Sequence, residues 1–264
     1  MTLSTQSAVS VVQLAFFIPF LFLSGWMIVK HGFRSAGGGW RYITILGLLR
    51  IIGSSCEIAG ESSPTNKSLR TVVLICNSIG LAPLLLQCTG LVTRANISIK
   101  SLPNRFFSIA NLVGTAGMVI AIIGAVKAVN STSGQFEIND FMVAGISLFI
   151  VLFALTLLAV VSMGTGMSTI ASSTHREHLG ARRIVMALAL CVPFLVVRIV
   201  YACIGTYGKN TNYMPGMGDP LVYLGMTVIT EIIVVCICLA LGIILPAPSD
   251  PVAEYKGYAG SGRV

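Results

Sequence analysis

The sequence predicts an all-α membrane protein with seven transmembrane helices, and its composition and the spacing of its apolar residues lead to this prediction. Of the 264 residues, 55% are hydrophobic and only 10% are charged, whereas soluble domains carry about 25% charged residues. The apolar residues gather in runs of the roughly 20 residues that a helix needs to cross a bilayer. These runs lack polar stripes wide enough to face water, which argues against a soluble helical bundle.

The seven expected spans follow one another with short connections and leave no room for a sizeable soluble domain. They cover residues 8–30, 40–60, 70–93, 106–128, 140–165, 182–207 and 219–245. We do not interpret the first as a signal peptide, because it is too long and lacks the flanking features of one. We expect one transmembrane domain over residues 1–246 and a short disordered cytosolic tail over 247–264, where proline and glycine are frequent.

The basic residues predict the orientation of the helices. Short cytosolic loops carry the excess of Lys and Arg, and here eleven lie on one side against four on the other. The N-terminus is therefore expected outside or in the lumen and the C-terminus in the cytosol, in the endoplasmic reticulum membrane. The basic residues form short patches between apolar runs, which does not indicate nucleic-acid binding. The eleven are Lys30, Arg34, Arg41, Arg94, Lys100, Arg105, Arg176, Arg182, Arg183, Lys256 and Arg263.

Two loops expected in the lumen contain sequons, at Asn66 and Asn130, where N-glycosylation is possible. A third sequon, at Asn96, falls on the expected cytosolic side and should stay unmodified. All seven cysteines lie within spans, so we expect no structural disulfide. The cysteines are expected to pack as small apolar side chains.

Missing residues exclude several classes of membrane protein. His31, His175 and His178 are expected in cytosolic loops, so no span offers a histidine to a di-iron centre, a b-type haem or a Ser–His protease. The seventh span has no lysine for a retinal Schiff base. The chain also lacks paired Asp-rich motifs, a P-loop and a dinucleotide fingerprint. We therefore expect no metal and no cofactor.

Ionisable residues within spans are costly, at about 2.5–3.5 kcal/mol each on insertion scales, and they suggest function by default. In the second span, Arg50 and Glu57 lie two helical turns apart on one face. The first span adds Gln13 and the third adds Asn77. In the sixth span, Arg198 and Tyr201 are neighbours at a spacing of three residues.

The seventh span begins with Asp219 and Pro220, a good pair for the N-cap and first position of a helix. Tyr223, Thr227 and Thr230 follow on the same face, and Glu231 beside them lies about 18 Å deep, near the middle of the bilayer. By depth, we expect Glu231 to pair with Arg50, and Glu57 and Asp219 to lie nearer Arg198. If the helices form a ring, these groups line one pocket. Two other interpretations stay open: an Arg–Glu pair that only clamps helices together, and an Asp219 that only caps its helix.

Three segments carry a resemblance to a known family: Leu48-Leu-Arg50-Ile-Ile-Gly-Ser-Ser-Cys-Glu57, Pro193-Phe-Leu-Val-Val-Arg198-Ile-Val-Tyr201 and Asp219-Pro-Leu-Val-Tyr223. With its length and spans, the chain resembles fungal seven-helix membrane-bound terpene cyclases of meroterpenoid biosynthesis, in particular the branch of the ascochlorin, ascofuranone and macrophorin pathways. The sister branch of that family uses an acidic residue on its second helix and another late in the chain. Glu57 and Asp219 are the matching positions here.

The resemblance implies a class II-type cyclase, which protonates a farnesylated phenol or its epoxide and needs no cofactor. The proton donor must be a carboxyl group that burial keeps protonated near pH 7. On this hypothesis Glu57 or Asp219 donates the proton, Arg198 and Tyr201 position the substrate oxygen or the partner carboxyl, and Tyr223 stabilises positive charge. Asn77, Arg50 and Glu231 complete the substrate-binding set. The expected partners are membrane lipid and the prenylated substrate, without nucleic acid or an obligatory protein partner.

Two other function classes fit seven spans. A seven-helix receptor or sensor would have the same orientation, but the chain lacks a luminal disulfide and the Asp-Arg-Tyr and Asn-Pro-x-x-Tyr motifs. A lipid-translocating transporter would need hinges within its spans, which Pro19, Pro83 and Pro193 leave open. A polyketide synthase gene and a prenyltransferase gene beside this one would favour the cyclase.

Overall fold

The computed structural model describes residues 4–31, 39–63, 66–129, 138–166, 175–208, 213 and 218–245. Over these ranges the chain is helical and contains no strand. Its helices are α1 (Thr5–His31), α2 (Gly39–Ser62), α3 (Lys67–Ile79), α4 (Leu81–Ile99), α5 (Asn104–Val129), α6 (Asp140–Gly166), α7 (His175–Tyr207), α8 (Pro220–Tyr223), a π-helix η2 (Leu224–Ile229) and α9 (Thr230–Ile244).

Seven helical stretches are long and apolar enough to cross a membrane, which confirms the predicted fold class. The third stretch comprises α3 and α4, and the seventh comprises α8, η2 and α9. This is consistent with a multi-pass integral membrane protein. The tail predicted over 247–264 and the sequon at Asn130 lie outside the described residues. Asn66 lies just before α3, where its side chain accepts a hydrogen bond from the backbone N–H of Ser68.

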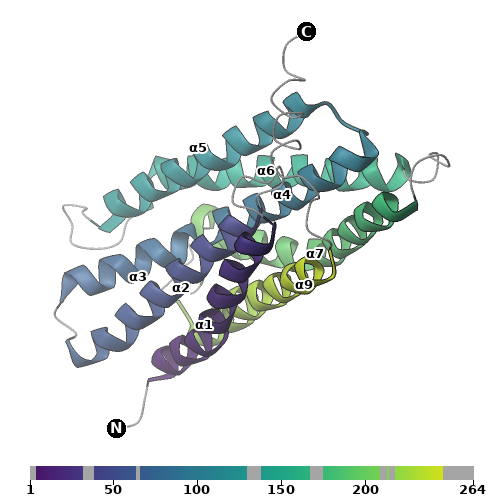
Figure 1. The fold of residues 1–264 in the computed structure, drawn as a ribbon. Helices are drawn as coiled ribbons and strands as arrows, with labels where there is room; N and C mark the ends of the chain where they lie inside the picture. The colour runs from purple at the N-terminus through teal and green to yellow at the C-terminus, as the bar shows by residue number, and fades with distance from the viewer. Residues whose placement is uncertain are drawn as a thin grey trace.

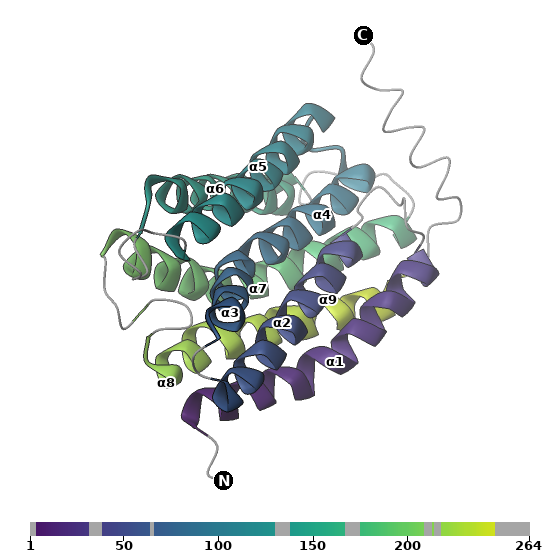
Figure 2. The same cartoon turned by 90° about the vertical axis from the view of Figure 1, so that its left-hand side faces the viewer.

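The helices lie side by side in one bundle with α4 at its centre (Figures 1 and 2). α4 packs against α2, α5, α6 and α7, and sixteen of its nineteen residues are buried. α1 packs against α2 and α9, so the first and last spans are neighbours. Large apolar side chains on the outer helices face outward, among them Phe22, Val29 and Leu112. An apolar exterior of this kind suits a lipid environment.

The third span is interrupted at Gly80, between α3 and α4. Pro83 explains the position of the break, because proline lacks the N–H that would bond to the carbonyl of Ile79 and its ring crowds that carbonyl. Gly80 also lies directly against the Arg50 side chain, and a Cβ atom there would collide with the guanidinium group. The absence of a side chain at Gly80 therefore makes room for Arg50.

Replacing Gly80 with alanine is expected to lower the free energy of unfolding by about 1–3 kcal/mol, the usual cost of overpacking a tight site. The added methyl group must displace Arg50, which is held by several hydrogen bonds. Thermal unfolding of the full-length protein in detergent measures the effect. Gly25→Ala is the control, because a Cβ at Gly25 meets nothing within 4 Å. Equal unfolding midpoints for the two variants would contradict the predicted clash.

The prediction that His31 lies in a loop needs correction. We expected a cytosolic loop, but His31 is the last residue of α1 and only 1% exposed. Its ring stacks on Trp40 with centroids 5.4 Å apart, and its Nε2 lies 3.1 Å from the carbonyl oxygen of Gly242 in α9. Lys30 donates hydrogen bonds to the backbone carbonyls of Ile243, Leu245 and Gly242. These carbonyls lie at the C-terminal end of α9, where they lack partners within the helix.

The loop expected for His175 and His178 is also corrected, because α7 begins at His175 and includes both residues. The expected sixth span began at residue 182, where the hydrophobic run begins. The helix continues seven residues further toward the N-terminus, beyond the apolar stretch that a bilayer requires.

Candidate functional site

The centre of the candidate site is a buried ion cluster that joins α2, α7 and α9. Arg50 donates to both carboxylate oxygens of Glu231, from Nε at 2.7 Å and from Nη2 at 2.5 Å. Arg198 donates from Nε to one of the same oxygens at 3.1 Å. All three residues are at most 2% exposed. The predicted pairing of Arg50 with Glu231 is confirmed.

The prediction for Arg198 needs correction. We expected Glu57 and Asp219 nearer to it, but its salt-bridge partner is Glu231. At the rise of an α-helix, Arg198 lies about 12 Å and Glu231 about 18 Å from the expected luminal ends of their spans, a difference of only about four residues. α7 and α9 pack against each other, so the long arginine side chain bridges this difference.

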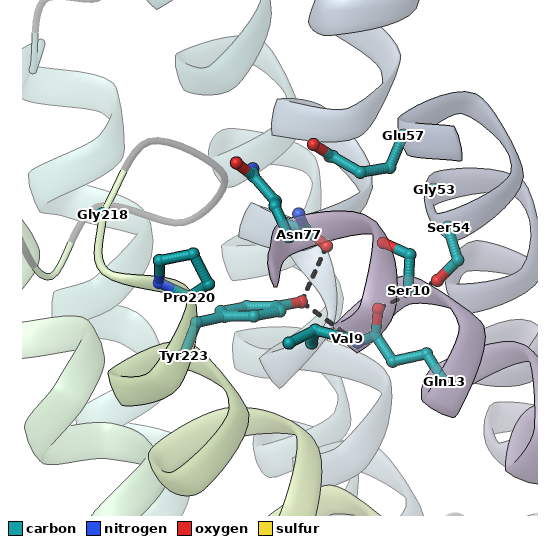
Figure 3. A pocket seen from close by; sticks show the side chains of 11 residues that line it. Val9, Ser10, Gln13, Gly53, Ser54, Glu57, Asn77, Gly218, Pro220 and Tyr223 are labelled. Carbon is teal, nitrogen blue, oxygen red and sulfur yellow. Dashed lines mark hydrogen bonds between the residues drawn. The ribbon is translucent and has the colours of Figure 1, made fainter. Parts of the chain in front are cut away.

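A network of uncharged polar side chains extends from the ion cluster toward the N-terminal end of α1. Arg50 donates from Nη1 to Asn77 and to the Tyr223 hydroxyl, each at 2.9 Å. The Tyr223 hydroxyl donates to Asn77 at 2.9 Å and accepts from Gln13 at 3.2 Å, as the dashed lines in Figure 3 show. Ser54 donates to the Gln13 side-chain oxygen at 2.9 Å. Together with the ion cluster, the network thus joins six helices, α1, α2, α3, α7, α8 and α9, which belong to five of the seven spans.

The π-helix brings Tyr223 and Glu231 to the same arginine. The two residues are eight positions apart, so in an unbroken α-helix their side chains would point in directions about 80° apart around the helix axis. A π-turn accommodates one extra residue, which reduces the offset to about 20°. The π-helix lies between these two residues, at Leu224–Ile229. Both side chains can therefore face Arg50 from one helical stretch.

Residues of this network line two cavities, and a third cavity shares Glu57 with one of them. The inner cavity, of about 380 Å³, is lined by α1, α2, α3 and the start of α8, and Tyr223, Gln13 and Asn77 contribute to its wall (Figure 3). The outer cavity, of about 730 Å³, lies at the end of the bundle where α1 begins and α2 ends. The arginine cavity, of about 510 Å³, is lined by Arg198 and by residues of α3 to α7. These volumes include space open to the surroundings, and the enclosed part of each cavity is smaller, about 20, 250 and 40 Å³ in the same order.

The predicted acids occupy different places. Glu57 is half-buried and lines both the inner and the outer cavity, at the point where the two adjoin. Asp219 is exposed and accepts a hydrogen bond from the backbone N–H of Leu221 at 2.9 Å, which is the N-cap geometry that the sequence predicted. Arg198 lines the arginine cavity, whereas Glu57 lines the other two. The single shared pocket expected for Glu57 and Arg198 is therefore divided.

The other predicted residues lie at or near the ion cluster. Arg50 bonds directly to Glu231, Asn77 and Tyr223, and Tyr223 also bonds to Asn77. The Tyr201 ring lies 5.9 Å from the Arg198 guanidinium carbon and 6.4 Å from the Tyr223 ring, measured between centroids. Sequence reasoning gave no role to Ser54, although its spacing of four residues from Arg50 places both on one helix face. Within the described ranges, no three metal-ligating side chains come together.

Replacing Tyr223 with phenylalanine is expected to lower the free energy of unfolding by about 1–3 kcal/mol, because the hydroxyl's partners lose hydrogen bonds in a buried site. Those partners are Arg50, Asn77 and Gln13. Thermal unfolding in detergent measures the change. Tyr207→Phe is the control: it removes the same atom from a tyrosine that is 48% exposed and bonds to Ser147 alone among described side chains. If Tyr207→Phe lowered the free energy of unfolding as much as Tyr223→Phe or more, the network would not stabilise the protein as described.

The fold and the buried cluster define a class: a seven-helix membrane protein with ion-paired side chains at its core. A family described as a domain of unknown function, DUF7702, matches residues 3–248, and the chain belongs to this family. The match includes all seven spans and every residue of the cluster. The search of curated proteins found no match.

Proposed function

We propose that the protein is a membrane-bound terpene cyclase that protonates a farnesylated substrate from Glu57. One observation carries the proposal: Glu57 is a carboxyl group on the wall of two adjoining cavities, and no described basic residue forms a salt bridge with it. Glu231 is unsuited to this role, because two arginines stabilise its anion. Asp219 is an exposed helix cap outside all three cavities.

The proposed reaction is an isomerisation that returns the acid to its starting state. Glu57 transfers its proton to a terminal alkene carbon or an epoxide oxygen of the substrate. The resulting carbocation is attacked by the π electrons of the next double bond, which closes a ring and moves the positive charge along the chain. Loss of a proton from the last cation to the Glu57 carboxylate forms the final double bond and restores the acid. Reactions of this kind require a site that excludes water.

The remaining residues of the inner cavity have supporting roles in this proposal. The Tyr223 ring lines the cavity and offers its face to a carbocation, as aromatic rings do for other cations. Arg50, Asn77 and Gln13 hold the Tyr223 hydroxyl in place and are positioning residues. The outer cavity provides the entrance, which the predicted orientation would place at the luminal side of the endoplasmic reticulum.

Conversion by membranes tests the proposal. Microsomes from a fungal host that produces the protein are given farnesylated phenols and their terminal epoxides, and the products are separated by mass spectrometry. We expect a cyclic product of unchanged mass, absent from microsomes of the empty host. For an alkene substrate in D₂O, the product should gain one carbon-bound deuterium, because the first proton comes from an exchangeable carboxyl. Failure to isomerise any member of this panel would contradict the cyclase.

A further inference from the structure

The arginine cavity and the inner cavity meet at Asn77, which lines both. Its polar wall consists of Asn77, Ser78, Arg198 and Thr206. The rest of the wall is apolar and includes Met142, Phe149 and Ala202. A pocket with a mostly apolar wall and a few convergent polar groups is the usual form of a small-molecule site.

Among the residues that the structure describes, the charges beside this cavity do not balance. Arg50 and Glu231 already form a complete two-pronged pair, with both carboxylate oxygens engaged. Arg198 adds a second positive charge and shares one of those oxygens. The three ionised groups therefore sum to one positive charge, at positions no more than 2% exposed. An uncompensated charge in such a place is expensive, and its presence points to an anion that binds there.

A second observation marks the same wall. The hydroxyl oxygen of Ser78 is buried and has no hydrogen-bond partner among the described residues, and Ser78 lines the arginine cavity. Buried hydroxyl groups are nearly always hydrogen-bonded in folded proteins, so an unsatisfied one calls for a partner. A ligand oxygen in the cavity would provide one. The excess charge and the unsatisfied hydroxyl therefore belong to one wall.

We propose that the arginine cavity binds an amphiphile with a single carboxylate, whose head group pairs with Arg198. A carboxylate matches the planar fork of a guanidinium group and carries the one negative charge that the cluster lacks. The apolar wall around Met142 and Phe149 contacts the part of the hydrocarbon chain next to the head group, and the rest of the chain leaves through the open side of the cavity. This site is independent of the proposed cyclase, because Glu57 lines the other two cavities and takes no part in it.

Binding of dodecanoate tests the site. The full-length protein is placed in nanodiscs of phosphatidylcholine, and displacement of the fluorescent fatty acid cis-parinaric acid is measured after subtraction of empty nanodiscs. We expect a saturable component that dodecanoate displaces and dodecanol displaces at least tenfold less well. Arg198→Met should weaken the affinity at least tenfold, whereas Arg198→Lys, which keeps the charge, should weaken it less. Arg105→Met is the matched control, since Arg105 is exposed near the opposite end of α5, and it should bind like the wild type.

A second variant keeps the proposal testable if Arg198→Met does not fold. Ala202→Phe fills the cavity while leaving every charged residue in place, and we expect it to remove the saturable component. Turnover by the cyclase plays no part in either readout, so the two proposals fail separately. Equal dodecanoate affinity in the wild type and Arg198→Met, equal displacement by dodecanol, or the absence of a saturable component would each overturn the proposed site.

Discussion

Glu231→Gln is expected to destabilise the protein by about 3–5 kcal/mol, the usual cost of removing one partner from a buried ion pair. Glutamine has the same shape but no charge, so Arg50 and Arg198 would remain as two unpaired cations at least 98% shielded from solvent. Their mutual repulsion adds to the lost attraction. A loss of this size is a large part of the total stability of an ordinary protein. We expect little folded protein in membranes and a clearly lowered unfolding midpoint in detergent.

Two other substitutions show whether the effect of Glu231→Gln comes from the unpaired charges or from a change in side-chain packing. Arg198→Met leaves the Arg50–Glu231 pair intact and removes the excess charge, so its unfolding midpoint should lie much closer to that of the wild type. Glu61→Gln makes the same chemical change as Glu231→Gln at an exposed acid and should leave the midpoint nearly unchanged. If Glu231→Gln unfolded at the wild-type temperature, the ion cluster would not contribute to stability as described.

Glu57→Gln is expected to lower turnover at least about 100-fold, because general acid–base groups contribute roughly 10²–10⁴-fold to rates. Glutamine keeps the size of the side chain and cannot supply the proton. The variant should fold normally, since Glu57 is half-buried and forms no salt bridge with a described residue. Product formation by microsomes with matched amounts of protein measures the effect.

Asp219→Asn is the matched control for Glu57→Gln. Asparagine is as good an N-cap as aspartate, so the hydrogen bond to the backbone N–H of Leu221 can be kept. We expect turnover within a few-fold of the wild type. Loss of turnover in Asp219→Asn, with retention in Glu57→Gln, would reverse the assignment of the proton donor. Retention in both variants would remove the acid from the proposed mechanism.

The spans and the Arg50–Glu231 pair could be predicted from the sequence for simple reasons. A bilayer imposes a length on every apolar helix, so seven runs of that length give seven spans. Depth along a helix follows from residue number, so two charges at similar depth are natural partners. The N-cap at Asp219 was also predictable, because capping depends on residues that are close in sequence.

The remaining features depend on helix rotation and on tertiary packing. The π-helix before Glu231 has no signature in the residues Leu224–Ile229, and it decides which side chains face Arg50. The division between cavities follows from how α3 lies between α2 and α5, which residue spacing does not specify. The burial of His31 depends on its contact with α9, more than 200 residues later. Such contacts between distant segments cannot be derived from local patterns.

The separation of the ion partners along the chain has a consequence for biosynthesis. Arg50 and Glu231 are 181 residues apart, and a ribosome that adds 5–20 residues per second needs about 10–40 s to make the stretch between them. During this interval the second span has already left the ribosome, while its counter-charge has not been made. The guanidinium group of Arg50 must therefore stay in the translocon or in water, without its carboxylate partner, until the final helix is inserted and completes the bundle.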